Sequence, residues 1–337
     1  MPQSALPILD LSQFDAGPDA RRHFLDDLGT AARDVGFFYL KGHGISQDLG
    51  QSVFKLSRSF FDLPEAEKLK IEMVHSPHFR GYTRVGKELT RGKPDRREEL
   101  DIGRELPVVS PVPPEQPWLS LQGPNQWPQA LPELKPALLE WQDLLTEILL
   151  KLLKAFALIL EQPEGAFDGL VGQTATRGLK IIRYPGVEVV GDDQGVGSHK
   201  DSGILTAVYQ DGVAGLQVGT DTGWVTAEPI PGTFVINIGE LLELATDGYL
   251  RATVHRVVSP PAGKERLSVA YFLGARLDAK VEVLPLPARL KALARGVAAD
   301  PLNPLFHDVG PNYLKSRLRS HVDVAQRHYA DLLSTQV

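Results

Sequence analysis

The sequence contains no cysteine among its 337 residues. Disulfide bonds, iron–sulfur clusters, thiolate zinc sites and cysteine nucleophiles are all excluded, because each of them needs a cysteine sulfur. Nine histidines and 42 acidic residues are present. Any metal chemistry in this protein must therefore use imidazole nitrogen and carboxylate oxygen as ligands.

An excess of basic charge is also missing. Lysine and arginine number 36 against 42 acidic residues, so the formal net charge is −6. No global basic field favours a nucleic-acid partner. The composition, with 42% hydrophobic and 23% charged residues, is that of an ordinary globular protein.

A long apolar run is absent as well. The most apolar stretch, residues 147–161, carries Lys151 and Lys154. Crossing a bilayer takes about 20 apolar residues in succession, so this stretch predicts a helix that faces the protein core. The N-terminus has no basic segment followed by an apolar one, so we expect no signal peptide, no membrane partner and a cytoplasmic location.

Helices dominate the predicted structure of the first half. Apolar residues recur at helical spacing over 19–35, and a short strand is expected at 37–40. Ser46 is a suitable N-cap for a second helix. A long helical stretch covers 131–160, with Pro136 bending or breaking it near its start.

Residues 84–104 are dense in charge of both signs. Two interpretations stay open for them. They form either a solvated surface loop or a mobile segment over a site entrance, where mixed charge selects a polar substrate. The proline-rich residues 109–127 that follow predict an ordered connector without strand or helix.

Short β-branched segments, separated by turns, fill the second half and predict a sandwich, jelly roll or barrel. Their ranges are 178–185, 202–210, 215–219, 223–228, 233–239, 252–259, 266–274 and 280–285. We expect a mainly β protein with added α: an antiparallel jelly roll with an N-terminal helical region. The predicted divisions are a helical and strand region at 1–125, the jelly-roll region at 126–283 with its supporting helix, and a C-terminal helical tail at 284–337.

The motif GSHKDSG at 197–203 carries the clearest chemistry. His199 and Asp201 are two residues apart, so on an extended strand both side chains project from one face. His255 lies in another predicted strand. Two histidines and one carboxylate form the facial triad of non-haem Fe(II) oxygenases, which leaves metal positions open for reactants. The alternative is a chance H-x-D beside an ordinary strand histidine.

Arg266 follows His255 by eleven residues and shares a strand face with Ser268. A buried arginine on such a face needs an anion, and its planar guanidinium pairs bidentately with a carboxylate. Ser268 can add a hydroxyl donor. The alternative partner for Arg266 is an aspartate or glutamate of the protein core.

These motifs, in this order, resemble those of the isopenicillin N synthase-like branch of the Fe(II)/2-oxoglutarate oxygenases. Further matching stretches extend the resemblance over most of the chain: LPILDLS at 6–12, DVGFFYLKGHGIS at 34–46, LKIIRYP at 179–185 and FVINIGELLELATDGYLRATVHRV at 234–257. One departure is Glu240, where the family usually has aspartate. The resemblance implies a double-stranded β-helix (jelly-roll) core with N-terminal and C-terminal helices.

The resemblance also implies the site. His199, Asp201 and His255 would be the catalytic Fe(II) ligands, and Arg266, Ser268 and Tyr184 would bind 2-oxoglutarate. The activity would be an oxygen-dependent hydroxylation, desaturation or cyclisation of a small molecule, with 2-oxoglutarate converted to succinate and carbon dioxide. The protein is expected to be a monomer or weak homo-oligomer.

Two alternative functions remain at this point. One is an isopenicillin N synthase-like Fe(II) oxidase that uses oxygen without 2-oxoglutarate. That enzyme has a glutamine ligand next to its C-terminus, and Gln336 is penultimate here, but its longer distance from Ser268 indicates a coincidence. The other is a non-catalytic jelly-roll binding protein. An intact triad argues against the second.

Several other residues receive structural interpretations. His43 is expected in a turn, Asn237 in strand packing, and Arg256 pointing away from the metal because it follows His255 directly. His75 and His78 lie in a segment that borders the active site in similar enzymes. His321 and His328, on the C-terminal helical pattern, are predicted to face solvent.

Overall fold

Two β-sheets form the centre of the structure, a computed structural model that describes residues 6–188, 194–298, 300–301 and 303–334. The larger sheet has, in spatial order, β1 (Ile8–Asp10), β2 (Phe37–Lys41), β12 (Phe234–Ile238), β9 (Leu205–Gln210), β14 (Glu265–Leu273), β7 (Arg177–Pro185), β6 (Glu98–Ile102) and β3 (Gly81–Thr83). The smaller sheet has β11 (Gly223–Thr226), β10 (Leu216–Thr220), β13 (His255–Val258) and β8 (Gln194–His199). A separate hairpin pairs β4 (Leu89–Thr90) with β5 (Lys93–Pro94).

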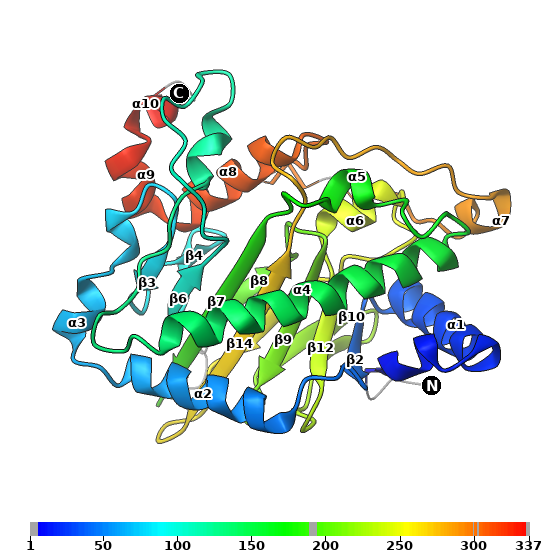
Figure 1. Ribbon diagram of the computed structural model, residues 1–337, viewed down its shortest axis with the longest axis horizontal. Helices are drawn as coiled ribbons and strands as arrows, with labels where there is room; N and C mark the ends of the chain where they lie inside the picture. The colour runs from blue at the N-terminus through cyan, green and yellow to red at the C-terminus, as the bar shows by residue number, and fades with distance from the viewer. Residues whose placement is uncertain (1–5, 189–193, 299, 302, 335–337) are drawn as a thin grey trace.

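Helices surround the sheets (Figure 1). Those of the described chain are α1 (Pro18–Asp34), α2 (Gln47–Phe61), α3 (Glu65–Leu69), α4 (Leu134–Ile159), α5 (Asp168–Val171), α6 (Glu240–Ala245), α7 (Ala288–Lys291), α8 (Val309–Ser320), α9 (Val322–His328) and α10 (Ala330–Ser334). Three 3-10 helices cover Leu11–Asp15, Met73–His75 and Pro117–Leu121. In Figure 1 the C-terminal helices α8 to α10 lie beside β3 and β4.

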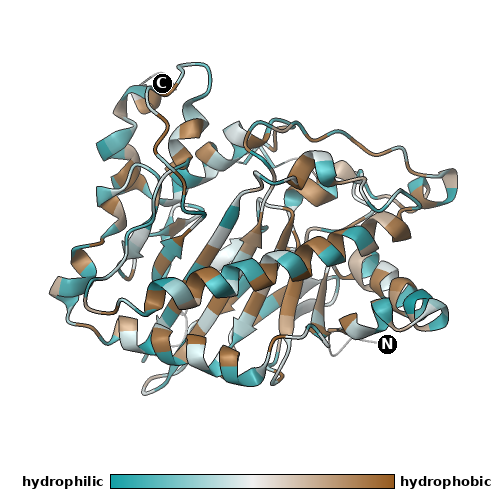
Figure 2. Ribbon diagram, viewed as in Figure 1, coloured by the Kyte–Doolittle hydropathy of each residue, from teal (hydrophilic) through white to brown (hydrophobic). Residues whose placement is uncertain are grey.

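Helix α4 packs across the outer face of the larger sheet. Its buried face includes Trp141, Leu149 and Phe156, which lie in one hydrophobic core with residues of β7, β9 and β14. Figure 2 shows that the strands behind α4 are largely hydrophobic, whereas α4 itself carries both kinds of residue along its length. Pro136 does not break α4, because it falls in the first turn, where its missing N–H has no intrahelical partner to lose.

A second hydrophobic core fills the space between the two sheets. It joins Ile182 and Tyr184 of the larger sheet to Val196, Val218 and Val257 of the smaller one. Since side chains alternate along a strand, Arg266 and Ser268 share the inner face with these core residues. Any ligand between the sheets therefore meets both the apolar core and these two polar side chains.

The predicted mixed fold is confirmed: a jelly-roll core with N-terminal and C-terminal helices. The strand predicted at 280–285 is wrong, because this segment forms no strand and makes only one isolated bridge, at Lys280. The division of the chain near residues 125 and 283 stays a prediction. Within the described residues no helix combines the length and apolarity that a bilayer crossing requires.

The interpretation of 84–104 as a solvated loop is wrong for its second half. Strand β6 is buried along its whole length and joins the larger sheet between β3 and β7. Its acidic residues are paired with cations from other elements: Glu98 with Lys68, and Glu99 with Lys180. These long-range ion pairs compensate the burial of charge, and no local sequence pattern predicts them.

Truncation of Leu149 tests the packing of α4. We expect Leu149→Ala to lower the free energy of unfolding by about 2–5 kcal/mol, because it leaves a cavity in the core between α4 and the sheet. Lys154→Ala, at an exposed position of the same helix, is the control and should change it by less than about 0.5 kcal/mol. Denaturant unfolding measures both, and equal effects would contradict the assigned packing.

Candidate metal centre

Strand register brings the three predicted metal ligands together. His255 at the start of β13 is the direct partner of His199 at the end of β8, and their ring centroids are 4.3 Å apart. Asp201 follows β8, and its Oδ1 lies 3.4 Å from His199 Nε2 and 3.6 Å from His255 Nε2. One ligand atom from each residue lies within 4.8 Å of the others. This set of two nitrogens and one oxygen fits a divalent iron with open positions.

Hydrogen bonds orient each of these side chains. His199 Nδ1 lies 2.8 Å from the carbonyl of Gly197, and His255 Nδ1 lies 3.1 Å from that of Thr253. A carbonyl only accepts, so each Nδ1 carries the hydrogen and each Nε2 presents its lone pair to the centre.

The carboxylate of Asp201 is held from its other side. Its Oδ2 accepts hydrogen bonds from Thr206 Oγ1 at 2.6 Å and Asn237 Nδ2 at 2.8 Å. Oδ1 is thereby left toward the two histidines. Asn237 was expected in strand packing, on a face that could reach the pocket. It is the direct partner of Thr206 in the register of β12 and β9, and a polar side chain inside an apolar strand was the signal that it could reach the site.

The pKa values of the triad differ strongly. Burial opposes the charge of Asp201, but the two histidines and the bond from Thr206 lower the pKa of Asp201 well below its ordinary value. Burial lowers the pKa of His199, yet the hydrogen bond and charge of Asp201 outweigh it, so the pKa of His199 is raised. Burial and the neighbouring His199 lower the pKa of His255 to about 4. The Asp201 carboxylate therefore stays ionised and offers its negative charge to a cation.

Arg266 is fully buried and has only neutral partners. Its guanidinium donates to the Val213 carbonyl at 3.1 Å, Ser268 Oγ at 3.2 Å and Gln210 Oε1 at 3.0 Å. It also lies over the ring of Tyr184, 5.0 Å from the centroid. Among the described residues no carboxylate lies within ion-pair distance of Arg266, so the alternative of a core acidic partner is wrong. A buried cation with this environment suits an anionic ligand.

The other predicted residues lie away from the metal centre or outside the described residues. His43 and His78 bond backbone carbonyls of Gly232 and Ser120, as residues of the framework. Arg256 lies on the outer side of the smaller sheet, 4.2 Å from the ring centroid of Trp224. The prediction that His321 faces solvent is wrong: it is buried, 3.5 Å from Glu88. Gln336 lies outside the described residues.

A second acidic and histidine group, Glu88, Glu99 and His321, also brings one ligand atom from each residue within 4.8 Å of the others. Lys180 already donates to both glutamates, at 2.7 to 3.1 Å, and Arg97 donates to Glu88 at 2.6 Å. These cations neutralise the group, so it makes a poorer metal site than the triad.

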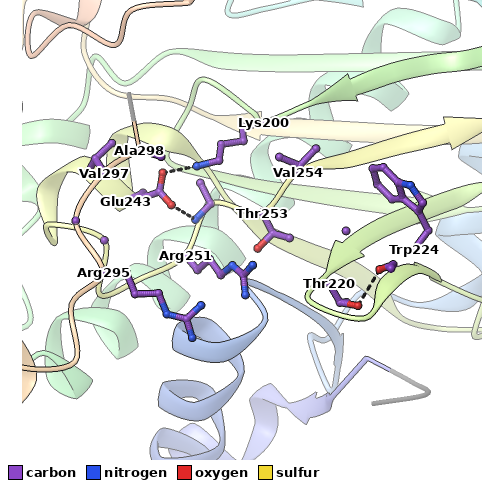
Figure 3. A pocket seen from close by; sticks show the side chains of 15 residues that line it. Lys200, Thr220, Trp224, Glu243, Arg251, Thr253, Val254, Arg295, Val297 and Ala298 are labelled. Carbon is purple, nitrogen blue, oxygen red and sulfur yellow. Dashed lines mark hydrogen bonds and ion pairs between the residues drawn. The ribbon is translucent and has the colours of Figure 1, made fainter. Parts of the chain in front are cut away.

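A cavity of about 520 Å³ is lined by Lys200, the residue between His199 and Asp201 (Figure 3). The Lys200 ammonium pairs there with Glu243 at 2.7 Å. Arg251, on another wall, donates to the Asp34 carbonyl at the end of α1. Lys200 and Arg251 therefore have structural partners, and none of the triad residues lines the cavity.

Comparison with known proteins agrees with this geometry. Residues 6–130 match a family described as non-haem dioxygenase in morphine synthesis N-terminal, and residues 176–275 match the 2OG-Fe(II) oxygenase superfamily. A 2-oxoglutarate-dependent dioxygenase, frbJ, of Dothideomycetidae sp. is 34% identical over 98% of this chain and 94% of its own. A homoarginine-6-hydroxylase of Arabidopsis thaliana is 36% identical over 84% of this chain and 88% of its own.

A solved structure is similar over nearly the whole chain. A full-length protein of Neurospora crassa, in complex with alpha-KG and 5-formyluracil, has a TM-score of 0.74 and 27% sequence identity, covering 95% of this chain and 97% of its own. The same fungal protein has also been solved with alpha-KG and thymine.

Removal of the Thr206 hydroxyl tests how Asp201 is held. We expect Thr206→Val, which keeps the side-chain shape, to raise the dissociation constant for Fe(II) about 10- to 100-fold, because Asp201 loses one of two orienting donors. Anaerobic Fe(II) titration measures this. Thr222→Val, at an exposed turn between β10 and β11, is the control. An unchanged constant in Thr206→Val would show that Asn237 alone orients the carboxylate.

Acidification should weaken metal binding through His199. The raised pKa of His199 means that this ring takes up a proton first as the pH falls, whereas His255 stays neutral down to about 4. Bound iron needs the unprotonated nitrogen, so Fe(II) affinity should fall as the pH decreases through the pKa of His199. NMR titration of the metal-free protein assigns the two steps. An Fe(II) affinity that does not change with pH over the same interval would contradict the predicted protonation of His199 before His255.

Proposed function

Since the chain belongs to the 2OG-Fe(II) oxygenase superfamily and is an Fe(II)- and 2-oxoglutarate-dependent dioxygenase, we propose that it hydroxylates a small polar molecule. In the proposed reaction a substrate C–H bond becomes C–OH, while 2-oxoglutarate and oxygen yield succinate and carbon dioxide. Desaturation or cyclisation would follow from a different placement of the substrate in the same site.

We propose that His199, Asp201 and His255 hold the Fe(II), which supplies the redox chemistry when bound. Arg266 and Ser268, with the ring of Tyr184 beneath the guanidinium, are proposed to hold the distal carboxylate of 2-oxoglutarate. The single observation that carries this assignment is a fully buried arginine without an acidic partner among the described residues, on the inner face shared with the metal centre. Gln210, which accepts from Arg266, is proposed to fix the guanidinium plane.

The proposal of a polar substrate rests on two supports. On the inner face of the larger sheet, Lys180 lies beside Ala270 and Glu99 lies beside Ile182, so the surface that carries Ser268 continues into a polar, ion-paired region. In addition, relatives are named for polar molecules: homoarginine for the plant enzyme, and thymine for the solved complex of the fungal one. Both molecules are small and rich in hydrogen-bonding groups.

The two alternative functions have less support. An oxidase that works without 2-oxoglutarate does not agree with relatives named as 2-oxoglutarate-dependent and similar over the full chain. A non-catalytic binding protein would not require three oriented ligands that leave metal positions open.

Replacement of Arg266 tests the cosubstrate assignment. We expect Arg266→Ala to raise the KM for 2-oxoglutarate at least about tenfold, the equivalent of about 1.4 kcal/mol, because a charge-assisted bidentate contact is lost. Fe(II) affinity should change little. Succinate release, with and without candidate substrates, measures the KM. Arg256→Ala, on the outer side of the smaller sheet, is the matched control, and an unchanged KM in Arg266→Ala would mean a purely structural arginine.

A further inference from the structure

Strand β8, which ends at His199, is an edge strand with an irregular register. It pairs only with β13 in the described sheet, and the partners run from His255↔His199 to Val257↔Val196. Between these pairs β8 takes three steps (199 − 196) where β13 takes two (257 − 255). One extra residue is therefore inserted in β8, the arrangement of a β-bulge.

The extra residue decides which way His199 points. In a regular strand, residues three apart lie on opposite faces, so Val196 and His199 could not both point inward. Yet Val196 is buried between the sheets, and His199 points at Asp201 and His255. The bulge at 197–198 allows both orientations at once. Without it, a strand that kept Val196 in the core would turn His199 toward the outer face.

Asp95 holds this bulge from the open side of β8. Its Oδ1 accepts from the backbone N–H of Gly197 at 3.1 Å and from Gln194 Nε2 at 3.1 Å. The backbone N–H of Arg96 donates to the Gln194 carbonyl at 3.0 Å. Residues 95–96 thus satisfy backbone groups that an edge strand otherwise leaves without a partner strand.

Gly197 permits this close approach. A Cβ built on Gly197 would lie 2.9 Å from Thr90 Cγ2, too close for any side chain without displacement of β4. The backbone of Gly197 therefore lies between Asp95 and the metal ligand His199. Its N–H donates to Asp95, and its carbonyl accepts the Nδ1 hydrogen of His199 at 2.8 Å. Movement of Asp95 would move the group that orients the imidazole.

Asp95 is itself held rigidly. It is fully buried, and its Oδ2 accepts from Thr90 Oγ1 at 2.7 Å and pairs with Arg97 at 3.4 Å. Arg97 is anchored in turn by Glu88 and Glu99, at 2.6 and 3.3 Å. The carboxylate therefore cannot rotate freely, and the position of Gly197 follows from the folded hairpin of β4 and β5.

We propose that Asp95 is a positioning residue for the iron: it stabilises the bulge in β8 that turns His199 inward. This inference rests on the proposed role of His199 as an Fe(II) ligand. It also assigns a role to the charged segment 84–104, whose hairpin holds the metal-binding strand in place.

The experiment compares Asp95→Ala with the unchanged protein. We expect the dissociation constant for Fe(II) to rise about tenfold or more in anaerobic titration, the size usual for loss of a group that orients a metal ligand. The visible charge-transfer band of the Fe(II)–2-oxoglutarate complex, recorded without oxygen, should shift because His199 is displaced. At saturating Fe(II), the KM for 2-oxoglutarate should stay within about twofold, since Arg266 is untouched.

Glu98→Gln is the matched control. Glu98 is another buried carboxylate of the same segment, but it bonds Lys68 and Tyr82 on the opposite face. It should lower the thermal midpoint without shifting the band or the Fe(II) constant. Equal changes in both variants, or an Fe(II) constant unchanged in Asp95→Ala, would overturn the inference. His199→Ala distinguishes failure of this inference from failure of the proposed function. If that variant keeps wild-type Fe(II) affinity, His199 is not an Fe(II) ligand and the proposed function itself is wrong.

Discussion

The pairing of His255 with His199 across β13 and β8 is the constraint on which the rest of the site depends. Two histidines that lie far apart in the sequence become neighbours because their strands are hydrogen-bonded at that point. Asp201 needs only the next turn to join them. A shift of this register by one residue would turn one imidazole to the opposite face of the sheet and separate the three ligands.

The structure keeps two buried charge environments apart. Around Arg266 the partners are neutral, so its positive charge remains available for an anion. Around Lys180 and Arg97 the partners are carboxylates, so those charges hold β6, β7 and the β4–β5 hairpin together. Arg266 and Arg97 are both buried, yet only Arg266 has the chemistry of a ligand site. Charge compensation, rather than burial, distinguishes them.

The candidate site was largely foreseeable, whereas its supports were not. His199, Asp201 and Arg266 stand in short motifs whose two-residue spacing has a direct geometric meaning on a strand. Asp95 and Thr206 carry no such signal, because their roles depend on partners 102 and 5 residues away that only folding brings into contact. His321 was predicted to face solvent because it falls on the C-terminal helical pattern. It is buried instead beside Glu88, where α8 is held to β6 by the ion pair of Arg317 with Asp101.

The sequence by itself determined the ligand types, since it has no cysteine, and its many short β-branched segments limited the fold to a sandwich, jelly roll or barrel. It also determined the order of the motifs that identify the family. Tertiary structure alone decided that His199 points inward, how the Asp201 carboxylate is oriented, and that part of the charged segment 84–104 is buried as strand β6. The physical reason is that strand register, a bulge and long-range ion pairs are set by contacts between distant residues, which local spacing does not encode.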